Sequence, residues 1–380
     1  MTTTTTVTTA TIEALKKRSL EAVKKAGLMP EASMEIKPFE TADKEAEPAI
    51  TWPSFLSHST ATKKFSKLFP TYWAVLKSKH QDFDVPVYGG YEWPENMQAH
   101  IPESSDYMSD PVLLYDAVLA YSCGSVTHLV GWPGTGKSAG LPVLIAATLG
   151  LPLLRLGLNK KGMGLDDLIG RESIKSSEHG TTTGHRDGVL CSWITHPCIV
   201  LADEFSRANQ EITNGLMSLM ERGGSLLIEN REASPVIKRH AGCWIIASDN
   251  VKGLGDGLDR GMVGTDQVDG AVLDRFEITL EVDYLTEKQQ LALIESWWTD
   301  YPKPVASKIV KFGMLIQQSY KKGVLPLSFS PRSLKEVCRY AGIHQDPKPA
   351  VRKVVLAKFA EEADISAIKE MYRTAFGEAL

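Results

Sequence analysis

An eight-residue glycine-rich segment constrains the fold of this chain more than any other part of its sequence. Residues 131–138 read GWPGTGKS and satisfy the pattern GxxxxGK[ST], directly after the apolar run at 127–130 and directly before a helix-compatible segment. In a strand, loop and helix of this kind, backbone N–H groups curl round a phosphate chain at the helix N-terminus. We therefore predict an ATP-binding loop made of Gly131, Trp132, Pro133, Gly134, Thr135, Gly136, Lys137 and Ser138.

Two side chains of this loop carry most of the predicted chemistry. Lys137 is placed to reach the β and γ phosphates, and Ser138 is placed to ligate Mg²⁺. Trp132 lies where almost any side chain is tolerated, and Ala139 replaces a second hydroxyl residue that is common at its position, so neither argues against ATP binding. The alternative, a glycine-rich turn without nucleotide, is disfavoured by the strand and helix patterns on either side.

A second motif ends a later apolar run in two acidic residues. Residues 198–204 read CIVLADE, and a buried strand has no structural use for adjacent carboxylates at its tip. We predict that Asp203 holds Mg²⁺ and that Glu204 polarises the water that attacks the γ-phosphate. The alternative is that the two acids cap a helix beginning near Ser206. Glu204 is the residue that predicts hydrolysis rather than binding alone.

A third apolar run, at 244–248, leads into Asp249 and Asn250. If this strand lies between the first two, Asn250 comes close to the γ-phosphate and can orient the attacking water. A simple turn asparagine is the competing interpretation.

Short apolar runs alternate with helical patterns between residues 109 and 284, which predicts an α/β fold. The runs are THLVG, LPLLRLGL, CIVLAD, GCWIIAS and FEITLEV. Strands buried on both faces have this texture, and interleaved helices imply a parallel sheet. The later pattern is helical, with Ser330 as N-cap and Pro331 at the first position of one helix. We predict three parts: an N-terminal region at 1–108, an α/β core at 109–284 and a helical lid at 285–380.

Composition excludes several functional classes. The 42 basic and 46 acidic residues give a net charge of −4, so no global field directs the chain to nucleic acid or to an anionic membrane. The five cysteines are an odd number without CxxC spacing, which favours a reduced, cytoplasmic chain. The longest apolar stretch, at 141–158, is too short to span a bilayer comfortably and contains Arg155, so we interpret it as a helix followed by a buried strand.

The N-terminal sequence indicates neither a secretory signal nor a known module. It has no apolar h-region, and its first dozen residues are a threonine-rich stretch that we expect to be a mobile tail. Apolar spacing at 11–25 predicts an amphipathic helix, followed by a charged linker with several prolines.

Together these motifs resemble the AAA+ ATPases, and within them the MoxR-like group that includes the small subunit of aerobic cobaltochelatase. The resemblance runs from about residue 106 to about residue 341. Its specific parts are RDGVLCSWITHPCIVLADE, ASDNVKGLGD, GTDQVDGAVLDRF and SPRSLKEVCRYA, at 186–204, 247–256, 264–276 and 330–341.

The resemblance implies a fold, an assembly and three residue roles. It implies a five-stranded parallel sheet in the order 5-1-4-3-2, a helical lid, and ATP bound between the subunits of a ring that is usually a hexamer. Carried over by position, Asn250 is the sensor-1 residue, Arg275 is the arginine finger given to the neighbour's ATP, and Arg332 is the sensor-2 residue of the lid. A permanently charged guanidinium suits a developing phosphoryl charge. The alternative for Arg275 is a surface salt bridge with Asp274.

Two segments match insertions of the same group. Residues 173–188 would interrupt the helix after the second strand, and residues 223–240 are typical of a hairpin before the fourth; such hairpins usually face the pore of the ring. The second one has a basic tip, which either touches an acidic protein tail or nucleic acid, or stays solvated. The basic residues are Arg231, Lys238, Arg239 and His240.

Three further residues lie in or beside the matching blocks. Arg207 resembles a second interface arginine. His185 and His196 lack neighbours with metal-ligand spacing, so we assign no metal beyond Mg²⁺.

Three functions are consistent with such an ATPase. The resemblance favours the motor subunit of a metal chelatase, whose metal and tetrapyrrole would be bound by a large partner protein. The alternatives are a MoxR-type chaperone that works with a von Willebrand A-domain protein, and a nucleic-acid motor, which the acidic charge balance disfavours.

Overall fold

The computed structural model describes residues 61–158, 163–177, 180–228, 231, 234–250 and 270–380. The predicted N-terminal tail, the helix at 11–25 and the linker lie outside these residues, as do the segments 251–256 and 264–269 of the family-like blocks. Among the helices described, none combines the length and the apolar character needed to cross a membrane.

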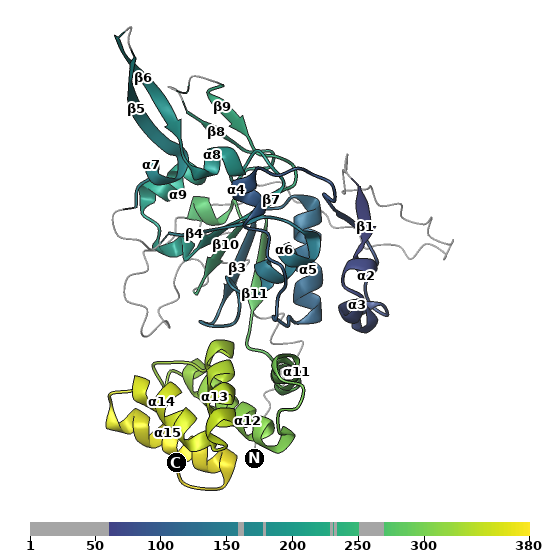
Figure 1. The fold of residues 1–380 in the computed structure, drawn as a ribbon, viewed down its shortest axis with the longest axis vertical. Helices are drawn as coiled ribbons and strands as arrows, with labels where there is room; N and C mark the ends of the chain where they lie inside the picture. The colour runs from purple at the N-terminus through teal and green to yellow at the C-terminus, as the bar shows by residue number, and fades with distance from the viewer. Residues whose placement is uncertain (1–60, 159–162, 178–179, 229–230, 232–233, 251–269) are drawn as a thin grey trace, which may run out of the picture. The chain divides into compact units, whose positions relative to one another are not determined.

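A parallel five-stranded sheet forms the centre of the α/β core (Figure 1). Its order is β11, β3, β10, β7, β4, which is 5-1-4-3-2 when its strands are numbered along the chain, as predicted. All five apolar runs singled out in the sequence are strands of this sheet. Their bounds are β3 Thr127–Gly131, β4 Leu153–Gly157, β7 Cys198–Asp203, β10 Cys243–Asp249 and β11 Ile278–Val282.

The pairing register brings the polar strand ends to one edge. Ser248 of β10 pairs with Asp203 of β7 on one side and with Leu129 of β3 on the other. Gly131, the first residue of the glycine-rich loop, pairs with Val282 of β11. Because the strands are parallel, the loop, the two acids and Asn250 all follow the same edge.

Both faces of the sheet are covered by helices, which explains the unbroken apolar runs. On β7, Ile199 and Leu201 pack into one hydrophobic cluster, and Val200 and Ala202 pack into another. The first cluster includes α5 (Pro111–Cys123) and α6 (Leu141–Leu149), and the second includes α8 (Val189–Trp193) and α9 (Gln210–Leu216). Alternating side chains of one strand are therefore buried in opposite layers.

The residues before α5 share its hydrophobic cluster. Phe65 is fully buried, and its ring lies 5.3 Å from that of Tyr115 in α5. The elements of this segment are β1 Thr62–Lys64, which pairs antiparallel with β2 Asp84–Pro86, and the short helices α2 Phe65–Leu68, α3 Pro70–Leu76 and α4 Glu95–Gln98. The domain boundary near residue 108 stays a prediction.

Two antiparallel hairpins extend from the core near one another (Figure 1). The first consists of β5 (Gly170–Ser177) and β6 (Gly180–Asp187), and follows the short helix α7 (Asp166–Ile169). The second consists of β8 (Ser225–Leu227) and β9 (Val236–Lys238). Both hairpins occur where the sequence predicts insertions.

The C-terminal residues form helices with a separate hydrophobic cluster around Phe312, Phe329 and Tyr372. The side chain of Ser330 caps α13 by accepting a 3.2 Å hydrogen bond from Ser333 N, and Pro331 occupies the first turn, as predicted. The helices are α11 Glu287–Trp297, α12 Lys303–Lys321, α13 Pro331–His344, α14 Pro347–Val354 and α15 Glu362–Phe376, with a 3₁₀ turn, η2, at Leu356–Lys358.

Candidate nucleotide site

The glycine-rich loop links β3 to α6 in a shape that only glycine permits at its first position. Gly131 has φ 155°, and a Cβ there would lie 2.0 Å from the carbonyl oxygen of Val282. Lys137 turns back over the loop, and its Nζ donates to the carbonyl oxygens of Gly131 (2.8 Å) and Trp132 (2.7 Å). These carbonyls hold the ammonium group at the centre of the loop.

Burial lowers the pKa of Lys137 to about 8, although the nearby carboxylates of Asp249, Asp203 and Glu204 oppose the change. Only 6% of the residue is exposed. An ammonium group in such a place is stabilised by any anion that enters the loop, because the anion compensates for the contact with water that burial has removed.

Asp203 accepts hydrogen bonds from donors on three different elements. Its Oδ1 accepts from the hydroxyls of Ser138 and Ser248, the latter at 2.6 Å. Its Oδ2 accepts from Arg155 Nε (2.9 Å) and Nη2 (2.5 Å). Burial acts to raise the pKa of Asp203, but these hydrogen bonds and the charge of Arg155 outweigh it and hold the pKa below its ordinary value. Asp203 is therefore an ionised carboxylate beside two hydroxyls, a donor set of the kind that Mg²⁺ prefers.

Glu204 adopts a backbone conformation that is uncommon for a residue with a side chain. Its φ of 57° and ψ of 48° lie in the left-handed region, immediately before the 3₁₀ turn η1 (Phe205–Arg207). Its carboxylate lies 3.1 Å from Arg207 Nη1 and makes no capping hydrogen bond to η1. The helix-cap interpretation of the two acids is therefore wrong: Asp203 is held by Ser138, and the side chain of Glu204 does not cap the turn that follows it.

One cavity of about 450 Å³ brings the predicted residues together. It is lined by loop residues, by the polar strand ends of β7 and β10, and by the start of α13. Its lining includes Gly134, Gly136, Lys137, Ser138, Asp203, Glu204, Asn250 and Arg332. Asn250 and Arg332 therefore lie where the sequence predicts, while their chemical roles stay predictions.

Arg275 is not among the residues that line this cavity. It follows α10 (Gly270–Leu273), donates from Nη1 to the carbonyl of Ala271 (2.9 Å), and reaches Glu221 Oε1 with Nη2 (3.3 Å). Its salt bridge is thus made with Glu221 and not with Asp274, the partner that the sequence alternative named.

Sequence reasoning missed several residues of the site, and three of them contact its predicted members. Arg155 and Ser248 both bind Asp203, and Tyr107 donates a 3.0 Å hydrogen bond to the carbonyl of Thr135. The signal for Arg155 was present, since it is the one charge inside the apolar run LPLLRLGL. Tyr107 gave no such signal, because it precedes the core strands and reaches the loop only through the tertiary fold.

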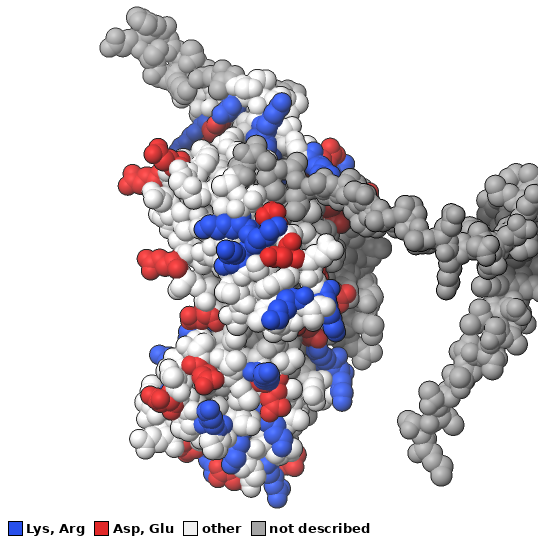
Figure 2. Space-filling model, turned by 90° about the vertical axis from the view of Figure 1, so that its right-hand side faces the viewer, with Lys and Arg blue, Asp and Glu red and all other residues white. Residues whose placement is uncertain are grey.

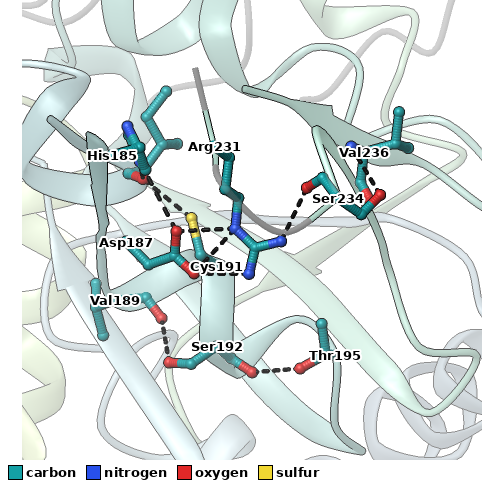
Figure 3. A network of polar contacts seen from close by, with 10 residues as sticks. His185, Asp187, Val189, Cys191, Ser192, Thr195, Arg231, Ser234 and Val236 are labelled. Atoms are coloured by element: carbon teal, nitrogen blue, oxygen red, sulfur yellow. Dashed lines mark hydrogen bonds and ion pairs between the residues drawn. The ribbon is translucent and has the colours of Figure 1, made fainter. Parts of the chain in front are cut away.

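The prediction of a basic tip on the second hairpin is wrong for three of its four residues, which are paired or partly buried. Arg231 binds the Asp187 carboxylate of the first hairpin through Nε (2.9 and 3.0 Å) and Nη2 (2.8 Å), as Figure 3 shows. Arg239 is partly buried and donates to the carbonyl of Glu221 (3.2 Å), and burial lowers the pKa of the partly buried His240. Lys238 alone of the four is exposed.

The two histidines considered as metal ligands have protein partners. Contrary to the sequence expectation, His185 does have neighbours suited to a metal: its ring nitrogen, the Asp187 carboxylate and the Cys191 thiol lie within 4.8 Å of one another (Figure 3). Arg231 already neutralises Asp187, and His185 Nε2 and Cys191 Sγ each lie 3.0 Å from the carbonyl of Ile169. His196 Nδ1 lies 2.8 Å from the hydroxyl of Tyr91.

Comparison with known proteins agrees with this geometry. Residues 127–276, from the start of β3 to just after Arg275, match the AAA domain of the dynein-related subfamily. The chain belongs to the AAA+ ATPases. Its AAA domain thus contains the glycine-rich loop, the acidic pair, Asn250 and Arg275.

Similar proteins differ in how much of this AAA+ ATPase they match. Aerobic cobaltochelatase subunit CobS from Sinorhizobium is 26% identical over 303 residues, 78% of this chain and 87% of that protein. Midasin from Giardia intestinalis is 31% identical over 184 residues, 48% of this chain and 3% of that protein. A solved structure of a Thermotoga maritima RuvB mutant aligns with a TM-score of 0.43 at 17% identity, over 72% of this chain and 81% of that one.

Proposed function

We propose that this AAA+ ATPase hydrolyses Mg²⁺–ATP at the interfaces of a closed ring of identical subunits, a hexamer, and that it uses the energy to remodel a partner protein. The observation that carries the proposal is the cavity shared by the glycine-rich loop, the acidic pair, Asn250 and Arg332. The domain organisation proposed with it is an N-terminal region at 1–108, the ATPase core at 109–284 and the lid at 285–380.

Within this site, each side chain has a distinct task. Lys137 neutralises the β and γ phosphates, and Ser138 and Asp203 supply oxygen ligands for Mg²⁺, which neutralises phosphate charge when bound. Glu204 accepts the proton of the attacking water, and Asn250 orients that water through its amide. Arg332 brings a cation from the lid to the phosphates, so that the lid responds to the state of the nucleotide.

The ring is inferred from Arg275. A guanidinium that stabilises phosphoryl transfer must reach the γ-phosphate, and Arg275 is not among the residues lining the cavity of its own chain. The proposal assigns it to the ATP of the neighbouring subunit. In that arrangement Arg275 exchanges the carboxylate of Glu221, which is 61% exposed, for the phosphates of the neighbour.

The client is proposed from the similarity to CobS. A cobaltochelatase subunit points to a large partner that carries out metal insertion, and this chain would act as its motor. The alternatives are a chaperone paired with a von Willebrand A-domain protein and a nucleic-acid motor. The second is disfavoured because Arg231 is paired with Asp187, and because both signs of charge are interspersed over the face drawn in Figure 2.

Three variants test the proposal. Glu204→Gln should bind ATP and form rings, yet hydrolyse at about 1% of the normal rate or less. Mixing Arg275→Ala with Lys137→Ala subunits should restore part of the activity, because each kind of subunit supplies what the other lacks. Light scattering with ATP should show a mass of about six subunits. Glu211→Gln, an exposed change on α9, is the matched control; normal turnover by Glu204→Gln would refute the assignment.

A further inference from the structure

A buried hydrogen bond joins two neighbouring strands directly behind the nucleotide site. His128 of β3 and Asp249 of β10 meet through Nε2 and Oδ2 at 2.8 Å, and their side chains are 4% and 2% exposed. A buried carboxylate is costly unless donors satisfy its oxygens, so this contact defines where the Asp249 side chain lies.

The second oxygen of Asp249 holds the turn that carries Glu204. Asp249 Oδ1 accepts a 2.7 Å hydrogen bond from the backbone N–H of Ser206. Ser206 lies in η1, two residues after Glu204, whose left-handed backbone begins that turn. The hydrogen bond to the Asp249 carboxylate on β10 therefore holds η1 in place directly after Glu204, whose backbone is in the left-handed region.

The ring of His128 reaches the other side of the same assembly. It stacks on Phe276, with ring centroids 4.5 Å apart and planes 18° from parallel. Phe276 also makes an edge-on contact with Phe205, at 5.4 Å, and it directly follows Arg275 in the chain. One imidazole thus contacts the neighbour of Arg275 and, through Asp249, the turn behind Glu204.

We propose that His128 and Asp249 are a pair of positioning residues for ATP hydrolysis, which hold the Glu204 turn through the hydrogen bond between them. This inference rests on the proposed function and adds two residues to it. Asp249 lies at the wall of the cavity, but both of its oxygens are engaged by protein donors, so we assign its effect to the position of Glu204 and not to contact with the phosphates. Asn250 follows Asp249 directly, so the same anchor also sets where that amide enters the cavity.

Two substitutions at His128 separate its hydrogen bond from its ring stacking. His128→Gln keeps an N–H donor for Asp249 but loses the aromatic ring, and His128→Phe keeps a ring on Phe276 but loses the donor. We expect His128→Phe and Asp249→Asn to lower kcat by about 10- to 100-fold, because small displacements of a group that acts on water have effects of that size. The Kd for ATP should stay within about threefold, and His128→Gln should retain most of kcat.

Thr127→Val provides a matched control on the same strand. Thr127 is fully buried beside His128, but its hydroxyl bonds the carbonyl of Ser125 and the indole of Trp244, away from the Glu204 turn. This variant removes a buried hydrogen bond from β3 and leaves the hydrogen bonds of His128 and Asp249 in place. It should lower the melting temperature about as much as His128→Gln does, with kcat unchanged.

The measurements are kcat, the Kd for ATP, ring mass and melting temperature for the full-length protein and each variant. Normal kcat in His128→Phe, or an equal loss of kcat in His128→Phe, His128→Gln and Thr127→Val, would overturn the inference. If Asp249→Asn does not fold, the two His128 variants still decide. A wild-type protein that binds ATP without hydrolysing it would refute the proposed function itself, an outcome that is distinct from any result with these variants.

Discussion

Arg155 Nη2 lies 2.5 Å from Asp203 Oδ2, so a cation from β4 neutralises the carboxylate that we propose as a ligand for Mg²⁺. Arg155 also lines the cavity, which places a guanidinium close to the position of the phosphates. Arg155 thus favours the ionised form of Asp203, and we predict that it also contributes positive charge to the binding of phosphate.

Arg155→Ala should raise the KM for ATP about 3- to 10-fold, since a half-exposed cation is partly screened by water. Arg155→Lys should recover part of the loss, because it restores the charge without the two-pronged contact. Steady-state kinetics at fixed ionic strength measure both. Arg171→Ala, an exposed change on β5, is the control, and an unchanged KM in Arg155→Ala would exclude a phosphate-binding role.

ATP binding should weaken as pH rises through about 8, the pKa to which burial lowers Lys137. Above that pH Lys137 is neutral when no ATP is bound, so ATP binding requires the uptake of a proton. The Kd should therefore rise by up to about tenfold per pH unit, until the pH exceeds the pKa that Lys137 has with ATP bound. Calorimetry in two buffers of different ionisation enthalpy should show proton uptake on binding. Lys137→Met should show neither effect, and a flat Kd between about pH 7 and 9.5 would contradict the expectation.

The same group makes a prediction about stability without nucleotide. Between about 8 and the ordinary Lys value of 10.5, the unfolded chain binds more protons than the folded one, so the contribution of Lys137 to stability rises with pH in that window. Comparing urea unfolding of the wild type and Lys137→Met at about pH 7.5 and 9.5 isolates it. Lys137→Met lacks the buried ammonium group, so its free energy of unfolding should exceed that of the wild type at the lower pH. This difference should shrink at the higher pH.

Arg231 and Asp187 should be energetically coupled, because their contact ties the two hairpins together. A double-mutant cycle with Arg231→Ala and Asp187→Asn should give about 0.5–1 kcal/mol in urea unfolding at pH 7, modest because both groups are partly exposed. The hydrogen bond from Arg231 lowers the pKa of Asp187, so this stabilisation is lost as the pH falls below the ordinary Asp value of 3.8. Additive single effects at pH 7 would mean that this ion pair does not hold the hairpins together.

Two glycines with positive φ should respond differently to alanine. Gly131→Ala should destabilise the protein by about 3 kcal/mol, because the added Cβ meets the Val282 carbonyl at 2.0 Å and would separate β3 from β11. Gly150→Ala also places a side chain at a positive φ, 67°, but the added Cβ has no atom within 4 Å, so this variant should lose about 1 kcal/mol. Urea unfolding of both variants checks the difference, and equal losses would mean that backbone handedness alone controls Gly131.

The nucleotide motifs are predictable because each is local or lies at a strand end. The glycine-rich loop is contiguous in sequence, and a parallel sheet places every strand's carboxyl end at one edge, so Lys137, Asp203 and Asn250 can be grouped from the sequence alone. The strand order followed from the family resemblance. The roles of Arg275 and Arg332 also came from that resemblance and stay predictions.

Other features escaped the sequence because they depend on contacts between distant segments. The four basic residues at 231–240 look alike in sequence, yet Arg231 meets a carboxylate 44 positions away and Lys238 is exposed. His185 acquires metal-ligand neighbours through the turn at the base of its hairpin, and Arg231 occupies the carboxylate that such a site would need.

The fold class, the loop that surrounds phosphate and the acidic pair can all be recognised in the amino-acid sequence, since they depend on hydrophobic periodicity and on short motifs with local geometry. How the charges pair is a property of the folded chain: Arg155 with Asp203, Arg231 with Asp187, and His128 with Asp249. The reason is physical. A charge in a sequence has many candidate partners, and the packing of the sheet and its helices leaves each buried or half-buried group within hydrogen-bond distance of very few.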